Sequence, residues 1–107
     1  EIANDFRDLR IAWYAWWQSH GLETIFQKYE LKPYHGSWLE AFPFTQVSDL
    51  PEGEKKPPHV PGLVGAEEAR EVYGDGVFGG KYQVDDTIMT EIFEICIADL
   101  VQILKFQ

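Results

Sequence analysis

The spacing of apolar positions changes along this sequence, and each spacing predicts a different element. Residues 10–17 (Arg-Ile-Ala-Trp-Tyr-Ala-Trp-Trp) form an almost unbroken apolar and aromatic run that does not alternate with polar positions. A short run of this kind is typical of a strand that is buried on both faces, as in a parallel sheet covered by helices. We therefore expect a buried strand at 10–17.

After residue 18 the apolar positions recur with a helical period instead. One helix is expected between Ser19, which is placed to cap it, and Pro33, which is placed to end it. Its apolar face consists of residues at i, i+3, i+4 and i+7: Leu22, Ile25, Phe26 and Tyr29. A second, short helix is expected over 66–72.

A long final helix is expected from a cap at Asp85 or Asp86 to about Lys105. Apolar residues occupy most of its positions and leave only a narrow polar stripe: Glu91, Glu94 and Gln102. A helix with this pattern is typically buried around most of its circumference, and we expect the same here.

Two segments rich in proline and glycine predict irregular backbone. Residues 48–65 contain four prolines and three glycines and are expected to form an extended arm. Four glycines in residues 74–80 indicate a tight loop that exposes its backbone. Between the first two helices, Ser37 and Glu40 have the spacing of a capping box at the start of a short helix, which Pro43 must kink or end.

This set of elements offers the expected strand no neighbours. A lone strand leaves its backbone N–H and C=O groups unpaired, which is costly when they are buried. We therefore interpret the 107 residues as a single unit of the α/β class, with one or few strands and several helices. Its sheet would be completed by a partner chain or by a missing N-terminal half.

The composition restricts the possible partners and location. Eighteen acidic and nine basic residues give a net charge of −9, so the chain offers no basic stripe for nucleic acid or for an anionic membrane. The apolar segment 88–104 contains Glu91, Glu94 and Asp99 and is not expected to span a membrane. Cys96 is the only cysteine, which excludes a disulfide within the chain, and we expect a buried thiol. Because the N-terminal residues lack the basic and apolar regions of a signal peptide, a cytoplasmic location is expected.

The stretch from Tyr34 to Phe44 concentrates the residues that could carry chemistry. His35 is the strongest catalytic candidate, because an unperturbed histidine has a pKa of about 6.5 and exchanges protons at neutral pH. The alternative is a histidine that packs beside a helix start. Glu40 could orient His35 or approach a metal pair, or it could serve only as the capping partner of Ser37.

Three further residues are candidates for contact with a substrate. Trp16, at the end of the expected strand, would either line a pocket or lie in the core or at an interface, and Trp38 is a second possible wall. Asp75, in the glycine loop, would either contact a ligand or form a turn. No two histidines have metal-ligand spacing such as i and i+4, so this chain alone is not expected to hold a catalytic metal pair.

Three motifs of this sequence resemble parts of the creatininase family of amidohydrolases, and they follow one another along the chain in the order expected for that family. The run His35-Gly36-Ser37-Trp38-Leu39-Glu40 resembles the His-(Ala/Gly)-x-x-x-Glu motif in the C-terminal half of that family. The aromatic run ending in Trp16-Trp17 resembles the strand that precedes this motif. The run from Gly74 to Gln83 resembles a Gly-Asp-Gly-x-Phe-Gly-Gly-x-Tyr-Gln segment of one branch. The likeness covers most of this chain but only the C-terminal part of a family member.

The resemblance implies a three-layer α/β/α fold, an oligomer, and metal-dependent hydrolysis of a C–N amide-type bond. The family's metal-binding Glu-x-His, Asp and His-x-Glu elements have no counterpart here, so a partner chain would hold the zinc, manganese or iron and supply the attacking hydroxide. His35 would then be the proton shuttle, with Trp16 and Tyr34 at the substrate. Tyr34 replaces an acidic residue of the creatinine-hydrolysing members, and Ala41 replaces a threonine or asparagine, so creatinine is not the expected substrate. The alternative is a non-catalytic structural or regulatory subunit that completes a partner's fold.

Overall fold

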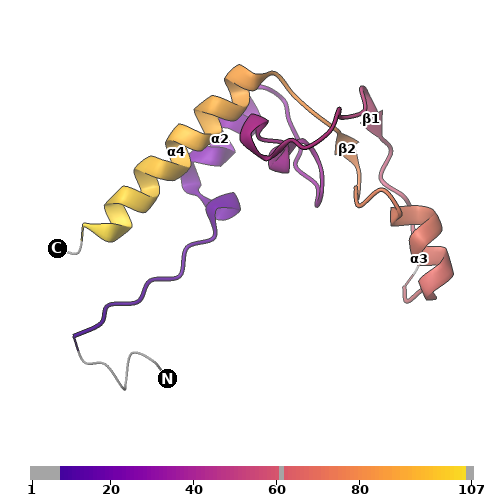
Figure 1. The fold of residues 1–107 in the computed structure, drawn as a ribbon, viewed down its shortest axis with the longest axis horizontal. Coiled ribbons are helices and arrows are strands. Elements are labelled where there is room, and N and C mark those ends of the chain that lie inside the picture. The colour runs from indigo at the N-terminus through magenta and orange to yellow at the C-terminus, as the bar shows by residue number, and fades with distance from the viewer. Residues whose placement is uncertain (1–7, 61, 106–107) are drawn as a thin grey trace.

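The computed structural model describes residues 8–60 and 62–105, which form a small, mostly helical unit with one short sheet (Figure 1). Its α-helices are α2 (His20–Lys28), α3 (Ala66–Tyr73) and α4 (Asp86–Leu104). Two-residue strands β1 (Glu54–Lys55) and β2 (Gly80–Lys81) pair antiparallel. Single turns of 3-10 helix form at Trp16–Gln18, Trp38–Glu40 and Pro43–Thr45.

All three α-helices lie where they were predicted. Asp85 caps α4 as expected, because its carboxylate accepts a hydrogen bond from the backbone N–H of Thr87. Ser19 precedes α2 but does not cap it, since its hydroxyl donates to the Asp99 carboxylate of α4 instead. The predicted start of α2 is therefore confirmed, and the predicted role of the serine is wrong.

The core is the contact between α2, α4 and the segment that follows α2. It consists of buried apolar residues from these three parts: Leu22, Ile25, Leu31, Trp38, Leu39, Phe42, Met89, Ile92 and Cys96. At one edge Glu91 of α4 accepts hydrogen bonds from the Lys28 ammonium (3.1 Å) and the Tyr29 hydroxyl (2.7 Å). The predicted burial of Cys96 is confirmed.

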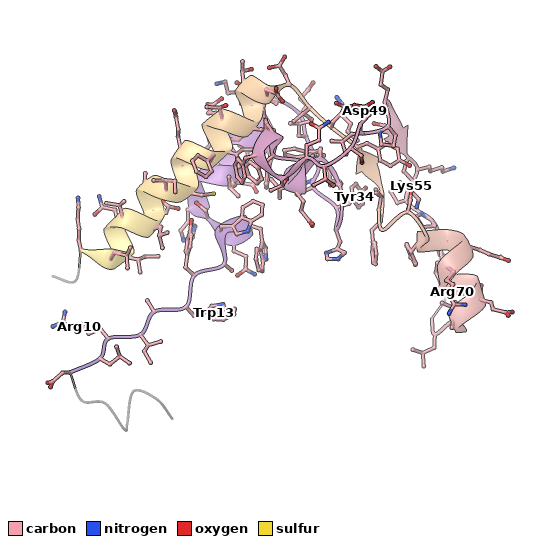
Figure 2. All side chains as sticks on the ribbon, in the orientation of Figure 1. Arg10, Trp13, Tyr34, Asp49, Lys55 and Arg70 are labelled. Atoms are coloured by element: carbon pink, nitrogen blue, oxygen red, sulfur yellow. The ribbon has the colours of Figure 1, made fainter. Side chains whose placement is uncertain are left out.

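The buried strand expected at 10–17 does not form. Residues 9–15 are extended but belong to no sheet, and the chain then turns through the 3-10 helix at Trp16–Gln18. Trp13 is 90% exposed and stands out from the ribbon (Figure 2). An apolar run can signal a buried strand only where neighbouring strands exist, and the described residues contain none beside this one.

Helix α4 is also less buried than its pattern predicted. Its buried residues, Met89, Ile92 and Cys96, lie on one side only. Phe93, Ile97, Val101 and Leu104 are exposed. Among the helices of the described residues, none is long and apolar enough to cross a membrane.

The molecule is open rather than closely packed. Its radius of gyration is 17.6 Å, whereas a compact domain of this length would have about 13 Å. Figure 1 shows α3 and the short sheet at one end, with the N-terminal segment and the end of α4 at the other. In the segment expected to be extended, the described residues 48–60 and 62–65 contain only the two residues of β1 as regular structure.

Candidate functional site

A tight turn at 34–37 sets the position of His35. The Ser37 hydroxyl donates to the Tyr34 carbonyl (2.7 Å) and accepts from the Tyr34 N–H (3.0 Å). Glu40 accepts a hydrogen bond from the N–H of Gly36 (3.0 Å). The predicted capping box is therefore wrong. In a capping box Ser37 and Glu40 would each accept a hydrogen bond from the backbone N–H of the other. Here the Ser37 side chain bonds to the backbone of Tyr34, and the Glu40 side chain bonds to the backbone of Gly36.

His35 and Glu40 lie next to each other on the surface. Nδ1 of His35 is 3.9 Å from Oε1 of Glu40, a distance at which a protonated histidine forms an ion pair but not a hydrogen bond. The His35 side chain is 74% exposed, so its ring can reach a bound molecule. Its other neighbour is Phe78, whose ring lies edge-on with the centroids 5.0 Å apart.

The glycine loop at 74–80 packs directly on the His35 turn. The N–H of Phe78 donates to the carbonyl of His35 (3.0 Å). Gly36 has φ +69°, and a Cβ there would collide with the carbonyl oxygen of Gly76. A Cβ on Gly80 would come within 2.7 Å of the Tyr34 ring. The two motifs that stand far apart in the sequence thus meet at one place, and glycine is what permits the contact.

Asp75 bonds to the glycine loop and to the segments on either side of it. Its carboxylate binds the Lys55 ammonium (2.6 Å), the Val77 N–H (3.1 Å) and the Tyr82 hydroxyl (3.2 Å). The hydrogen bond from Lys55, followed by that from Val77, lowers the pKa of Asp75. Through these contacts Asp75 connects the glycine loop to β1, a structural role that needs no ligand.

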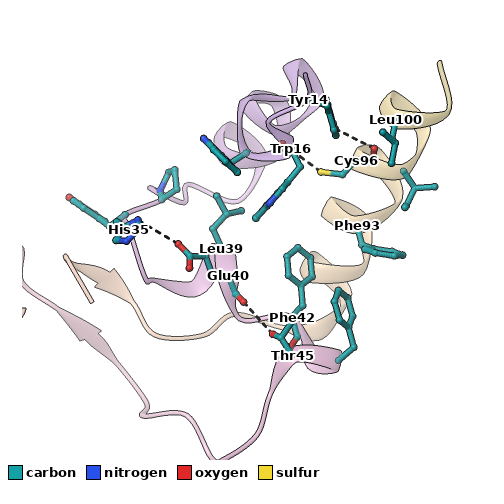
Figure 3. A pocket seen from close by; sticks show the side chains of 15 residues that line it. Tyr14, Trp16, His35, Leu39, Glu40, Phe42, Thr45, Phe93, Cys96 and Leu100 are labelled. Atoms are coloured by element: carbon teal, nitrogen blue, oxygen red, sulfur yellow. Dashed lines mark hydrogen bonds and ion pairs between the residues drawn. The ribbon is translucent and has the colours of Figure 1, made fainter. Parts of the chain in front are cut away.

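A hollow of about 900 Å³ opens beside His35, between the segment 33–45, residues 14–17 and α4 (Figure 3). His35, Glu40 and Tyr34 line its polar end, whereas Phe93 and Leu100 line the other. Binding sites for small molecules are typically apolar clefts of about this size with a few polar groups. The hollow therefore has the form of a binding site, although one side of it is open.

Aromatic rings form the floor of this hollow. Trp16 meets Phe42 edge-on at 5.5 Å, and Phe42 stacks on Phe44 at 5.2 Å. Phe44 in turn contacts Phe93 of α4 at 5.4 Å. Trp16 lines the same hollow as His35, Glu40 and Tyr34 and also packs against the core, and its predicted contact with a substrate stays a prediction.

Trp38 is separated from this hollow. Its side chain is completely buried in the core, and its Nε1 donates to the carbonyl of Lys32 (3.1 Å). It supports the turn from below and is not among the residues that line the hollow. Its burial and its hydrogen bond account for it without a substrate.

Several residues of the hollow were not candidates from the sequence. Phe42 and Phe44 stood within the stretch of interest, but nothing in their spacing indicated a pocket. Phe93 was expected in the core. Cys96 lies at the far end with its Sγ 3.7 Å from the Trp16 carbonyl, and burial raises the pKa of this thiol. A protonated thiol is a poor nucleophile, so Cys96 serves as packing.

The described residues do not provide a metal site. No group of three or more His, Cys, Asp or Glu side chains within 8–60 and 62–105 is placed to hold a metal ion. His35 and Glu40 alone would give two donors, fewer than the three or four protein ligands that a zinc site uses. A metal at this site would need ligands from another polypeptide segment.

Comparisons of this chain with protein-family models, with curated proteins and with solved structures find no match. The resemblance to creatininase-family amidohydrolases therefore rests on the quoted motifs and stays a prediction.

Proposed function

We propose that this chain supplies the proton-transferring part of an amidohydrolase site, at which a C–N amide-type bond is hydrolysed. The observation that carries the proposal is the placement of His35 and Glu40, 3.9 Å apart, at the polar end of the aromatic hollow. The motif likeness to creatininase-family enzymes points to the same reaction. The metal ligands would come from a separate segment, since the described residues hold no suitable group.

The chemistry assigned to His35 is protonation of the departing nitrogen. An amine leaves an amide carbon readily only when it accepts a proton, and histidine provides one near neutral pH. Glu40 lies on the Nδ1 side of the ring, which leaves Nε2 free to face a substrate. Glu40 is itself fixed by the Gly36 N–H, so we assign it as a positioning residue.

The hollow favours a substrate with an apolar or aromatic part. Trp16 and Phe42 offer ring faces and edges, while the polar groups lie at the His35 end. In this proposal Tyr34 and Trp16 contact the substrate, and Asp75 and Trp38 support the turn from behind. The proposal includes a three-layer α/β/α fold for the complete assembly, an oligomer, and a cytoplasmic location.

The test is turnover by the assembled enzyme, isolated with its metal-bearing segment and assayed against linear and cyclic amides. His35→Gln is expected to lower kcat by about 10²–10⁴-fold, the usual contribution of a general acid, with a much smaller change in KM. His59→Gln is the matched control, because His59 is exposed and is not among the residues that line the hollow. Unchanged turnover in His35→Gln would exclude the proton-transfer role.

The second candidate is a structural subunit that completes a partner without taking part in catalysis. The observation in its favour is the open form of the chain, with large apolar side chains exposed on α4 and the N-terminal segment. The same variants separate the two candidates. A structural subunit would lose assembly when its apolar surface is changed, but it would not lose turnover when His35 is replaced.

A further inference from the structure

The charge of the lining distinguishes the hollow beside His35 from an ordinary apolar cleft. Glu40 is the only acidic residue among the described residues that line it, and none of these is lysine or arginine. His35 is the only other lining residue whose ordinary pKa lets it carry a charge near neutral pH. The described lining therefore offers a ligand one carboxylate and no fixed positive charge, in a chain whose net charge is −9.

Glu40 keeps one carboxylate oxygen for a ligand. Its Oε1 accepts the hydrogen bond from the Gly36 N–H (3.0 Å) and is also the atom that lies 3.9 Å from Nδ1 of His35 (Figure 3). Neither contact uses Oε2, and the side chain is 52% exposed. A carboxylate that is held through one oxygen keeps its charge and can still accept from a second partner. Glu40 is thus placed to meet a positively charged group at the polar end of the hollow.

The aromatic floor adds a second feature that favours a cation. Phe42 and Phe44 stack with 20° between their ring planes, whereas Trp16 stands at 66° to Phe42. Rings at such different angles present both edges and faces to the space between them. An aromatic face carries the negative end of the ring quadrupole and attracts a cation within about 6 Å of its centroid. Phe44 is 69% exposed, so part of this floor is open to a ligand.

One ring of the lining already has an ammonium beside it. Nζ of Lys32 lies 5.2 Å from the centroid of the Tyr34 ring, within the range of a cation–π contact. Tyr34 lines the hollow and also a smaller recess, and Lys32 lines only that recess. Tyr34 is therefore partly covered by Lys32, and the rings of the floor are the ones left for a ligand.

We infer that the hollow binds an organic cation of the alkylammonium class, with its charge beside Glu40 and its alkyl groups against the aromatic floor. An alkylammonium group combines a positive charge with an apolar surface, and a carboxylate next to aromatic rings recognises both properties. The binding of the cation stands on the lining of the hollow alone. Its assignment as the charged part of the amide substrate rests on the proposed function.

Ligands of other charge classes fit this lining less well. An anion would lie beside the Glu40 carboxylate, and no lysine or arginine among the described lining residues would offset the repulsion. A neutral apolar ligand would cover the rings but would remove water from Glu40 without giving it a partner. A metal ion would find too few donors among the described residues.

In the proposed reaction the cation would hold the substrate so that its amide nitrogen lies at His35. Glu40 and His35 occupy the same end of the hollow, so a substrate held at Glu40 reaches the histidine. Binding energy from a part of the substrate that does not react can be used to position the part that does. The charge on the substrate is therefore expected to raise kcat as well as to lower KM.

The binding test uses this chain and two ligands that differ in charge alone. Choline is compared with the neutral alcohol in which carbon replaces its quaternary nitrogen, at about 0.15 M salt, which screens long-range attraction to the net charge. An NMR titration follows the indole N–H signals of Trp16 and Trp17, which line the hollow, with the buried Trp38 as internal reference. We expect choline to bind at least about fivefold more tightly than the alcohol and to shift the Trp16 and Trp17 signals only.

Two pairs of variants locate the cation. Glu40→Gln removes the charge but keeps an oxygen for the Gly36 N–H, and it should weaken choline binding at least about threefold. Glu94→Gln, at an exposed carboxylate of α4 outside the lining, changes the net charge equally and should leave binding within about twofold. Phe44→Leu should weaken choline binding about threefold, whereas Phe44→Tyr keeps the ring and should stay within about twofold. Phe44 is largely exposed, so neither change is expected to unfold the chain.

Turnover by the assembled enzyme separates this inference from the proposed function. An amide that carries a trimethylammonium group is expected to have a kcat/KM at least about tenfold above that of its neutral isostere. Hydrolysis of both amides with equal kcat/KM would overturn the inference and leave the proposed function in place. Choline binding that depends on Glu40, without hydrolysis of either amide, would support the cation site and overturn the proposed function.

Two results of the titration would also overturn the inference. Equal affinity for choline and the neutral alcohol would show an apolar hollow that does not recognise charge. Equal weakening by Glu40→Gln and Glu94→Gln would show that choline is attracted by the net charge of the molecule and not by Glu40.

Discussion

At the scale of single residues, Gly36 is where the two motifs of the candidate site meet. Its φ is +69°, in the left-handed region that favours glycine. The carbonyl oxygen of Gly76 occupies the space that a Cβ would need. Gly36→Ala is expected to destabilise the fold by roughly 1–2 kcal/mol for the left-handed backbone and about 1–3 kcal/mol for the collision. Urea denaturation measures the sum.

Gly53→Ala is the matched control, because Gly53 has a φ of +83° but nothing within 4 Å of its would-be Cβ. It should show the backbone cost alone. The Phe78 amide bonds to the His35 carbonyl. Its hydrogen-exchange rate should increase in Gly36→Ala and stay unchanged in Gly53→Ala. Equal destabilisation by both would mean that the glycine loop does not pack on the His35 turn.

Asp75 makes the glycine loop sensitive to acid. Hydrogen bonds from Lys55 and Val77 lower its pKa in the folded chain, so it contributes stability above the unfolded-state pKa of about 3.9 and loses that contribution as the pH falls through the lower folded value. Below about pH 4 the Asp75→Asn variant should therefore lose less stability than the original chain. Thermal unfolding between pH 3 and pH 7 checks this, with the exposed Asp49→Asn as control. Parallel pH profiles for Asp75→Asn and the original chain would contradict it.

At the scale of elements, the end of α2 carries a correctable strain. Glu30 has a φ of +52°, and the N–H of Leu31 bonds back to the Phe26 carbonyl, so Glu30 occupies the position where glycine usually ends a helix. Glu30→Gly should relieve roughly 1–2 kcal/mol of backbone strain and lose about 0.5–1 kcal/mol through the freer unfolded chain. A net gain of about 0.5 kcal/mol in the free energy of unfolding is expected. Gln27→Gly, inside α2, should instead cost about 1 kcal/mol, and destabilisation by Glu30→Gly would contradict the assigned helix end.

The elements that were predictable are those whose signal is local. The helical spacing of Leu22, Ile25 and Phe26 and the cap at Asp85 reflect contacts within a few residues, and the corresponding helices are present. The run at 10–17 was assigned to a strand because apolar residues imply burial, yet a strand also needs neighbouring strands, and the part of the chain that the structure describes places none beside it. The same reason explains why α4 is less buried than predicted. Its apolar pattern predicts burial around most of the helix, but the described residues cover only one side of it.

The candidate site was predictable to the same extent. His35 and Glu40 are five residues apart and were expected near each other. Their meeting with Phe78 depends on tertiary packing, which no spacing in the sequence indicated. Phe93 and Cys96 reach the hollow from α4, and no spacing in the sequence indicates which side of that helix faces His35.

At the scale of the whole molecule, stability is concentrated at one end. The core joins α2 and α4, whereas α3 contains no buried residue and lies at the opposite end of the molecule (Figure 1). Regions with few buried apolar contacts open at lower free energy than the core. The chain is therefore expected to unfold in at least two steps, with α3 opening first.

Ile92→Ala tests this division, because Ile92 lies on α4 and is fully buried in the core. Loss of its side chain should destabilise α2 and α4 by about 2–5 kcal/mol, seen as faster exchange of their most protected amides. The amides of α3 should keep their exchange rates, because they already exchange through local opening. Ile97 is an exposed isoleucine on the same helix. Ile97→Ala should lower the free energy of unfolding by less than about 1 kcal/mol. It therefore separates the loss of packing from the change in helix propensity. If Ile92→Ala accelerates exchange in α3 as much as in α4, the molecule unfolds as one unit and the division is wrong.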